Sequence, residues 1–227
     1  MKKIILILII IPIIGISQQE YYKWDIGING GVNINNPIVK GENFTLDDLG
    51  GQLYGLTFIY HFNRFFAFKV DLDIENRGWA MEQFGDKNDG SGDPELKNIS
   101  QVLDYFDIPA FMHVGFGKKF KVDLNIGPYF GFKIKDEIIS YDSDGTELDE
   151  SATRGKIGLS EFDNFDFGVV YGIGFDYQIH ERFSIGFDAL YERGLKAVNK
   201  INDTDYKNSS FDFDFGINFH LRKKKKK

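Results

Sequence analysis

Four histidines and a set of regularly spaced charged residues are the side chains of this chain that could do chemistry. Ester or amide hydrolysis needs a base such as histidine beside a nucleophilic serine. His61, His113 and His220 lie near one common end of the segments that contain them, and His180 lies at a short turn at that end. We therefore expect no catalytic residue and no cofactor site, and interpret the histidines as polar interior or interfacial residues.

Charged side chains recur at every other position in several segments. Two interpretations are open: a path for ions or protons, or a plug in which opposite charges pair. A narrow interior favours the plug, and because acids outnumber lysines we expect some carboxylates to meet water, Arg77 or loop groups. The predicted interior polar network consists of Lys69, Asp71, Asp73, Glu75, Lys121, Asp123, Lys133, Asp166, Asp176, Asp188, Asp212 and Asp214.

The elements that must position these residues are two-faced β-strands. In residues 165–179 every second side chain is large and apolar, and Gly, Asp, Val and Gln stand between them. This period of two predicts a strand, and the chain contains about eight such segments. Eight strands enclose too little space for stacked rings, so the rings must point outward into lipid while the small and polar residues fill the interior.

These segments predict an all-β fold, an eight-stranded antiparallel up-and-down transmembrane β-barrel. The connections after the first, third, fifth and seventh strands are long and polar, whereas the other three have two or three residues. Outer-membrane barrels keep short turns and chain ends in the periplasm, so we expect the same orientation here. Pro109 and Pro128 interrupt two strands and predict bulges. The expected strands cover about residues 22–34, 52–62, 66–75, 102–116, 120–134, 165–179, 183–192 and 211–221.

The start of the chain is typical of a secretory signal peptide. Two lysines precede an apolar run over residues 4–14, and small residues precede Gln18. The alternative, a membrane-anchoring helix, needs about 20 apolar residues, which is longer than this run. We expect a signal peptide at 1–17, an outer-membrane barrel at 18–221 and a basic tail at 222–227.

Composition narrows the function further. The formal net charge of −7 argues against a nucleic-acid partner. The absence of cysteine rules out disulfides and thiolate metal sites. Residues 136–164 carry nine acidic residues, and residues 141–150 superficially resemble a calcium loop. The glycine in that stretch comes too early for an EF-hand, so we expect no metal site and interpret the segment as a solvated loop.

Several segments together resemble the PorT-like outer-membrane β-barrel family, often labelled porin family proteins. These segments are YFDIPAF at 105–111, GPYFGF at 127–132, residues 165–174 and the Phe-rich last strand. The resemblance implies an architecture similar to OmpX- and OmpA-type eight-stranded barrels and a link to protein secretion or gliding. The lysines at 223–227 follow the last strand, where barrels of this class usually end on an aromatic residue.

We expect a non-catalytic integral outer-membrane protein with a structural, surface-interaction or envelope-assembly role. The alternatives are an accessory part of a secretion or gliding apparatus, a narrow small-solute channel and, least favoured, a lipid-modifying enzyme. The lipid-modifying barrels that resemble this fold act on the outer leaflet, which the histidines expected at the periplasmic end cannot reach. The expected partners are outer-membrane lipids and lipopolysaccharide, the barrel-assembly machinery during insertion, and a secretion-apparatus or surface partner.

Overall fold

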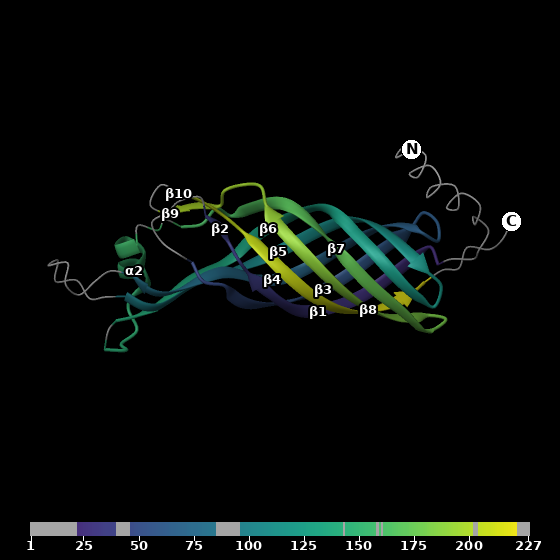
Figure 1. Ribbon diagram of the computed structural model, residues 1–227, viewed down its shortest axis with the longest axis horizontal. Coiled ribbons are helices and arrows are strands. Elements are labelled where there is room, and N and C mark those ends of the chain that lie inside the picture. Colours follow the sequence, from purple (N-terminus) through teal and green to yellow (C-terminus); the bar gives the residue numbers. More distant parts are fainter. Residues whose placement is uncertain are drawn as a thin grey trace, which may run out of the picture.

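Eight strands form a closed antiparallel barrel, as the alternation predicts. The computed structural model describes residues 22–39, 46–84, 96–142, 144–157, 159, 161–201 and 204–221. Each barrel strand pairs with its neighbours along the chain, and the last strand closes the barrel on the first (Figure 1). In order, the barrel strands are β1 (Trp24–Asn35), β3 (Leu49–His61), β4 (Phe66–Phe84), β5 (Leu96–Gly117), β6 (Phe120–Tyr141), β7 (Phe165–His180), β8 (Phe183–Gly194) and β11 (Ser209–His220).

The two faces of the strands are oriented as the side-chain sizes predict. Phe68 and Phe213 lie on the outer face and are 42% and 37% exposed. Asp71, Asp166 and Asp214 lie on the inner face and are at most 5% exposed. The outer face therefore presents a continuous apolar surface, the apolar band, which fits hydrocarbon better than water.

The apolar band ends abruptly on the outer face of three neighbouring strands. Asn76 of β4 pairs with Asp104 of β5, which in turn pairs with Lys135 of β6. The Asn76 amide donates a 2.7 Å hydrogen bond to the Asp104 carboxylate. Lys135 is ion-paired to Glu137, two residues further along β6. Because charged groups at this level must be solvated, residues beyond this row lie outside the membrane-spanning part of the strands.

Strands β4, β5 and β6 run past this row and are longer than predicted. The sequence predicts a loop over 82–98 and another over 136–164, but β4 reaches Phe84, β5 starts at Leu96 and β6 reaches Tyr141. The reason lies partly in a register shift, because Asp104 pairs with Lys135 whereas Tyr105 pairs with Lys133. The extra residue in β6 reverses its faces, which hides the end of the strand from a strict period of two.

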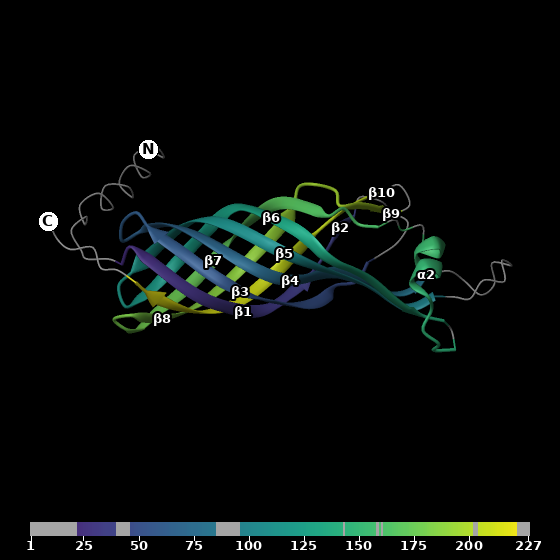
Figure 2. The same ribbon diagram turned by 180° about the vertical axis from the view of Figure 1, so that it is seen from behind.

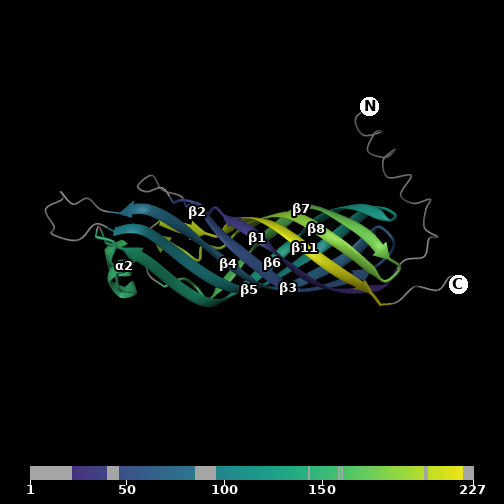
Figure 3. The ribbon, with the colours of Figure 1, turned by 90° about the horizontal axis from the view of Figure 1, so that it is seen from below.

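The extended strands carry a loop-end platform with a core of its own. The platform also contains the helix α2 (Glu150–Ile157) and a three-stranded sheet of β2 (Ile38–Val39), β9 (Asn199–Ile201) and β10 (Thr204–Lys207). The ribbon views place it at the end of the long axis opposite the start of β1 and the end of β11 (Figures 1, 2 and 3). Its buried core consists of Trp79, Met81, Leu96, Ile99, Leu103, Tyr105, Ile138, Ile157, Leu159, Phe162, Val198 and Tyr206.

Within the described ranges, no helix has the length and apolarity needed to cross a bilayer.

The predicted bulges at Pro109 and Pro128 are wrong. Pro109 stays in register with Tyr129, and Pro128 stays in register with Val169. Between β4 and β5 the ladder is instead interrupted for two residue pairs at Pro109. Between β5 and β6 it is interrupted for two residue pairs at Pro128, and the register is the same on both sides of each interruption. Each missing N–H therefore removes ladder pairing locally and inserts no residue.

The end of the barrel opposite the platform is called here the turn end. The connections there are short, and the Leu221 amide donates a 2.9 Å hydrogen bond to the Trp24 carbonyl, which ties the end of β11 to the start of β1. The predicted signal peptide at 1–17 and basic tail at 222–227 lie outside the described residues.

Candidate functional site

Arg77 lies at the centre of a buried charged cluster where the barrel meets the platform. It continues the inward alternation of β4 and is 2% exposed. Its Nη2 lies 2.8 Å from Glu75, 2.5 Å from Glu192 and 3.1 Å from Asp107, and its Nη1 lies 3.1 Å from Asp166. One guanidinium thus contacts carboxylates from four strands, β4, β5, β7 and β8, and cross-links the wall of the barrel.

Two tyrosine rings complete the surroundings of Arg77. The guanidinium carbon lies 4.6 Å from the ring centroid of Tyr129 and 5.3 Å from that of Tyr105. The Tyr129 hydroxyl donates a 3.1 Å hydrogen bond to Asp166, which also accepts a 2.8 Å bond from the Asn208 amide. The Tyr129 ring has room because Gly168 lies against it: a Cβ at Gly168 would be 2.4 Å from a ring carbon.

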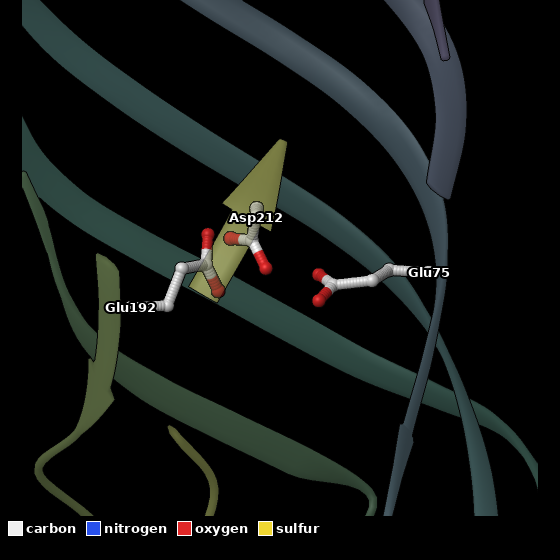
Figure 4. Close-up of side chains that lie close together, drawn as sticks. All are labelled: Glu75, Glu192 and Asp212. Carbon is white, nitrogen blue, oxygen red and sulfur yellow. The ribbon is translucent and has the colours of Figure 1, made fainter. Parts of the chain in front are cut away.

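Three carboxylates converge beside Arg77. Glu75, Glu192 and Asp212 project from three different strands and turn their carboxylates toward one another (Figure 4). One ligand atom from each lies within 4.8 Å of the other two, and all three residues are buried. Among the described residues, this is the group whose geometry could hold a metal ion.

A second charged cluster surrounds Lys69 nearer the turn end. Lys69 Nζ lies 2.8 Å from Asp188 and 3.3 Å from Asp71. The Asn29 amide donates hydrogen bonds to Asp73 (2.8 Å) and to Asp214 (3.2 Å). An apolar group lies between the two clusters and contacts both. The Lys69 ammonium is 5.4 Å from the centroid of the Phe111 ring, and the Arg77 guanidinium is 4.6 Å from that of Tyr129. This group consists of Phe111, Tyr129, Val170 and Leu190.

Carboxylates engage three of the four histidines, His61, His113 and His220, whereas His180 accepts a 3.3 Å hydrogen bond from the Arg182 backbone amide. Asp25 accepts one contact from His61 Nε2 and one from His220 Nδ1, each at 2.7 Å. His113 contacts Asp123 at 3.3 Å. Ser184 lines the same cavity of about 560 Å³ as His61 and His220, but its hydroxyl makes no hydrogen bond to them. The arrangement therefore lacks the base-to-hydroxyl contact that activates a serine nucleophile.

The structure separates the predicted polar network into distinct groups. Glu75, Asp166 and Asp212 belong to the surroundings of Arg77, and Lys69, Asp71, Asp73, Asp188 and Asp214 belong to the second cluster. Asp123 contacts His113, whereas Lys121 and Asp176 line the turn-end cavity. Lys133 contacts Asp136 at 2.8 Å and the Phe162 carbonyl at 2.5 Å, at the base of the platform.

The predicted network omits Arg77 and Glu192, although both follow its alternation. Arg77 is the next inward position after Glu75 on β4, and Glu192 is two inward positions after Asp188 on β8. Arg77 lies two residues beyond the predicted end of its strand, and extending that strand in the period of two would have included it. Glu192 is the last residue of the predicted strand 183–192 and was left out of the network although it follows the alternation. The ends of strands are the least reliable part of a sequence-based assignment, and this cluster lies at such ends.

A salt bridge outside the membrane attaches α2 to β6. Arg154 of α2 lies 2.5 Å from Asp136, and the hydroxyls of Ser140 and Thr153 are hydrogen-bonded at 2.6 Å. Burial alone raises the pKa of Asp136, but hydrogen bonds from Lys133, Arg154 and the Phe162 amide outweigh it and hold the pKa below 3.8. The helix is therefore fixed to the platform by charged and neutral contacts.

Comparison with known proteins gives a family match over most of the chain. Residues 16–200 match the model of a family described as outer membrane protein beta-barrel domain. Neisserial surface protein A is 10% identical with a TM-score of 0.48, over 90% of this chain and all of that one. OprG of Pseudomonas aeruginosa is 16% identical with a TM-score of 0.43, over 88% of this chain and 98% of that one. Ail of Yersinia pestis is also 16% identical, with a TM-score of 0.42 over 87% of this chain and 99% of that one. No curated protein matches the sequence significantly.

Proposed function

The chain belongs to the outer membrane protein beta-barrel domain family. From this premise we propose that it is a non-catalytic barrel that presents a rigid interaction platform at the cell surface. Membership makes it an integral protein of the bacterial outer membrane. The observation that carries the proposal is the platform, which has its own buried core and stands on three strands that continue unbroken from the barrel wall. A solvated loop would need neither feature.

The packed interior supports a non-conducting role. Arg77, Lys69 and Phe111 are all at most 5% exposed, and they belong to two charged clusters and the apolar group between them. Large solutes would have to break several buried ion pairs to pass. We expect planar-bilayer recordings of the refolded chain to give no conductance steps above leak, and regular steps would favour the small-solute channel instead.

The proposal requires the platform to face the outside and the turn end to face the periplasm, as in other outer-membrane barrels. Ala152 of α2 and Arg182 of the β7–β8 turn are both exposed and offer a matched pair of positions. A membrane-impermeant thiol reagent applied to intact cells should label Ala152→Cys and leave Arg182→Cys unlabelled. The reverse pattern would refute the orientation.

A photo-crosslinking residue at position 152 tests the interaction role directly. We expect it to capture a defined envelope or surface partner in intact cells, with the same residue at position 182 as the control. Identical products from both positions, or none from position 152, would contradict a surface-interaction role. Lipopolysaccharide is the non-protein partner that this experiment would also reveal.

A narrower form of the proposal assigns the platform to a protein secretion or gliding apparatus. It rests on the PorT-like segments at 105–111 and 127–132, which contribute Tyr105 and Tyr129 to the surroundings of Arg77. Copurification of the full chain from outer membranes with other apparatus components would support it. Recovery of the barrel as a free monomer under the same conditions would count against it.

A further inference from the structure

The cluster around Arg77 has far more negative than positive groups. Glu75, Asp107, Asp166 and Glu192 each lie within 3.1 Å of the guanidinium. Asp212 converges on two of them, so five carboxylates surround one cation. The lysine of the second cluster, Lys69, is already engaged by Asp71 and Asp188. Burying this many carboxylates without a further positive charge is costly.

The carboxylate of Asp212 is the observation that points to a ligand. It is 3% exposed, and its Oδ1 has no hydrogen-bond partner. Figure 4 shows its carboxylate turned toward those of Glu75 and Glu192. Arg77 contacts the Oε2 atoms of these two glutamates. The Oε1 atom of Glu75 accepts a 2.7 Å hydrogen bond from the Asn33 amide and keeps a second lone pair for a ligand. A set of carboxylate oxygens therefore faces a common point beside the guanidinium.

We propose that Glu75, Glu192 and Asp212 bind a hard divalent cation, with Ca²⁺ as the best match, at the junction of barrel and platform. Hard cations take carboxylate oxygens, and Ca²⁺ does so at about 2.3–2.6 Å in flexible geometry. Oxygens on opposite sides of such an ion are roughly 4.6–5.2 Å apart. The three candidate ligand atoms lie within 4.8 Å of one another, which agrees with that separation. Mg²⁺ demands near-ideal octahedral geometry and gives up its waters reluctantly, so three buried carboxylates suit it less well than Ca²⁺.

The bound ion would join β4, β8 and β11, the strands that carry the three ligands. Strand β8 ends and strand β11 begins near this level, whereas β4 continues into the platform. The ion would therefore fix the base of the platform to the part of the barrel wall that stops there. This role is separate from surface interaction, because a platform that binds no partner could still hold the ion.

Ca²⁺ binding to the full chain tests the proposal. Because the ligands are buried, the chain should be refolded in detergent with Ca²⁺ or with a chelator, and bound metal measured after equilibrium dialysis. We expect one Ca²⁺ per chain that Asp212→Asn removes or weakens at least about tenfold, since even outer-shell changes cost that much. Asp214→Asn is the matched control: it removes a buried carboxylate from the next inward position of β11 and should leave binding unchanged.

Two results would overturn the site. One is no bound metal at roughly millimolar Ca²⁺, the weak limit of extracellular calcium modules. The other is equal binding by wild type and Asp212→Asn, which would move the ion to acidic residues elsewhere. Terbium luminescence sensitised by the neighbouring tyrosines and displaced by Ca²⁺ gives a readout on the wild-type chain alone, should the variant fail to fold. No such displacement would count against the proposal.

The stability of the folded chain toward urea gives a second, independent test of the site. In chelator, Asp212→Asn should raise the urea midpoint, because it relieves repulsion among the carboxylates. In Ca²⁺ the order should reverse, because only the wild type gains the ion as a ligand of the folded state. An unchanged order in the two conditions would mean that the carboxylates are neutralised by protons or by Arg77 alone.

Discussion

Replacing Arg77 by methionine should destabilise the barrel severely. The substitution keeps an apolar stem but leaves Glu75, Asp107, Asp166 and Glu192 without the cation that contacts all four. Removing one partner of a buried ion pair costs about 3–5 kcal/mol, because the remaining charge stays desolvated. The loss of two aromatic ring contacts adds up to about 2 kcal/mol. A loss of about 4 kcal/mol or more is a large part of the roughly 5–15 kcal/mol that stabilises a typical domain.

The assay is equilibrium urea unfolding of the refolded chain in detergent, followed by tryptophan fluorescence. Chelator should be present throughout, so that no metal ion replaces the guanidinium. Arg182→Met, in an exposed turn, removes the same charge and should change the unfolding free energy by no more than about 0.5 kcal/mol. Adding Glu192→Gln to Arg77→Met should recover part of the loss, because one uncompensated charge disappears.

The outcome that would refute this reasoning is an Arg77→Met chain within about 1 kcal/mol of wild type. Such a result would mean that water or protons already neutralise the carboxylates. Arg77→Lys separates charge from geometry. Lysine keeps the charge but lacks the planar fork that reaches several carboxylates at once, so the lysine variant should fall between wild type and methionine.

Three further predictions concern packing, the apolar band and the platform. Gly168→Ala should cost about 1–3 kcal/mol by overpacking, measured by urea unfolding, because the new Cβ would meet the Arg193 carbonyl oxygen and the Tyr129 ring; an unchanged midpoint would contradict these contacts. Phe213→Arg should cost about 2–4 kcal/mol in lipid-reconstituted protein, because it places a charge on the lipid-facing side. Because the folded-state pKa of Asp136 is depressed, its stabilisation is complete above pH 3.8 and is lost as the pH falls through the lower folded value. The protection of the α2 backbone amides from hydrogen exchange should therefore fall below pH 3.8, and equal protection across that range would refute a role for the contact with Arg154.

The barrel could be predicted from the sequence because its physical rule is local. At most positions of the membrane-spanning strands, large apolar residues alternate with small or polar ones, and the difference in size decides which face turns inward. The inward-facing Phe111, Tyr129, Val170 and Leu190 depart from this rule. Phe213 and Asp214 illustrate this rule, since neighbours on one strand have opposite environments. A closed antiparallel barrel follows from the count of strands and the alternation of long and short connections.

The platform could not be predicted in the same way, because its strands obey a different rule. Beyond Asn76 and Asp104 the outer face becomes polar, and the extra residue in β6 reverses the faces so that Ile138 turns inward. The core there also depends on Tyr206, which is distant in the sequence. Hydrophobic residues gathered from several loops leave no periodic signal in any one of them.

The prediction for the charged residues was limited for a related reason. Alternation identifies Glu75 and Asp212 as inward-facing, but it does not say which inward residues lie at the same height in the barrel. That depends on strand register, and register decides that they converge with Glu192 while Lys69 serves a different cluster. Arg77 lies one alternation beyond the predicted end of its strand, so it was expected as a partner of some carboxylates but not as the central residue of the cluster.

The unbroken course of β4, β5 and β6 has a mechanical consequence. From Lys135 to Tyr141 the chain advances by about 3.4 Å per residue, so this strand rises roughly 20 Å past the last apolar level before any correction for tilt. A force applied by a ligand at the far tip would travel along these hydrogen-bonded strands into the embedded wall. The guanidinium and its ring of acids sit at the root of this lever, where bending would be greatest.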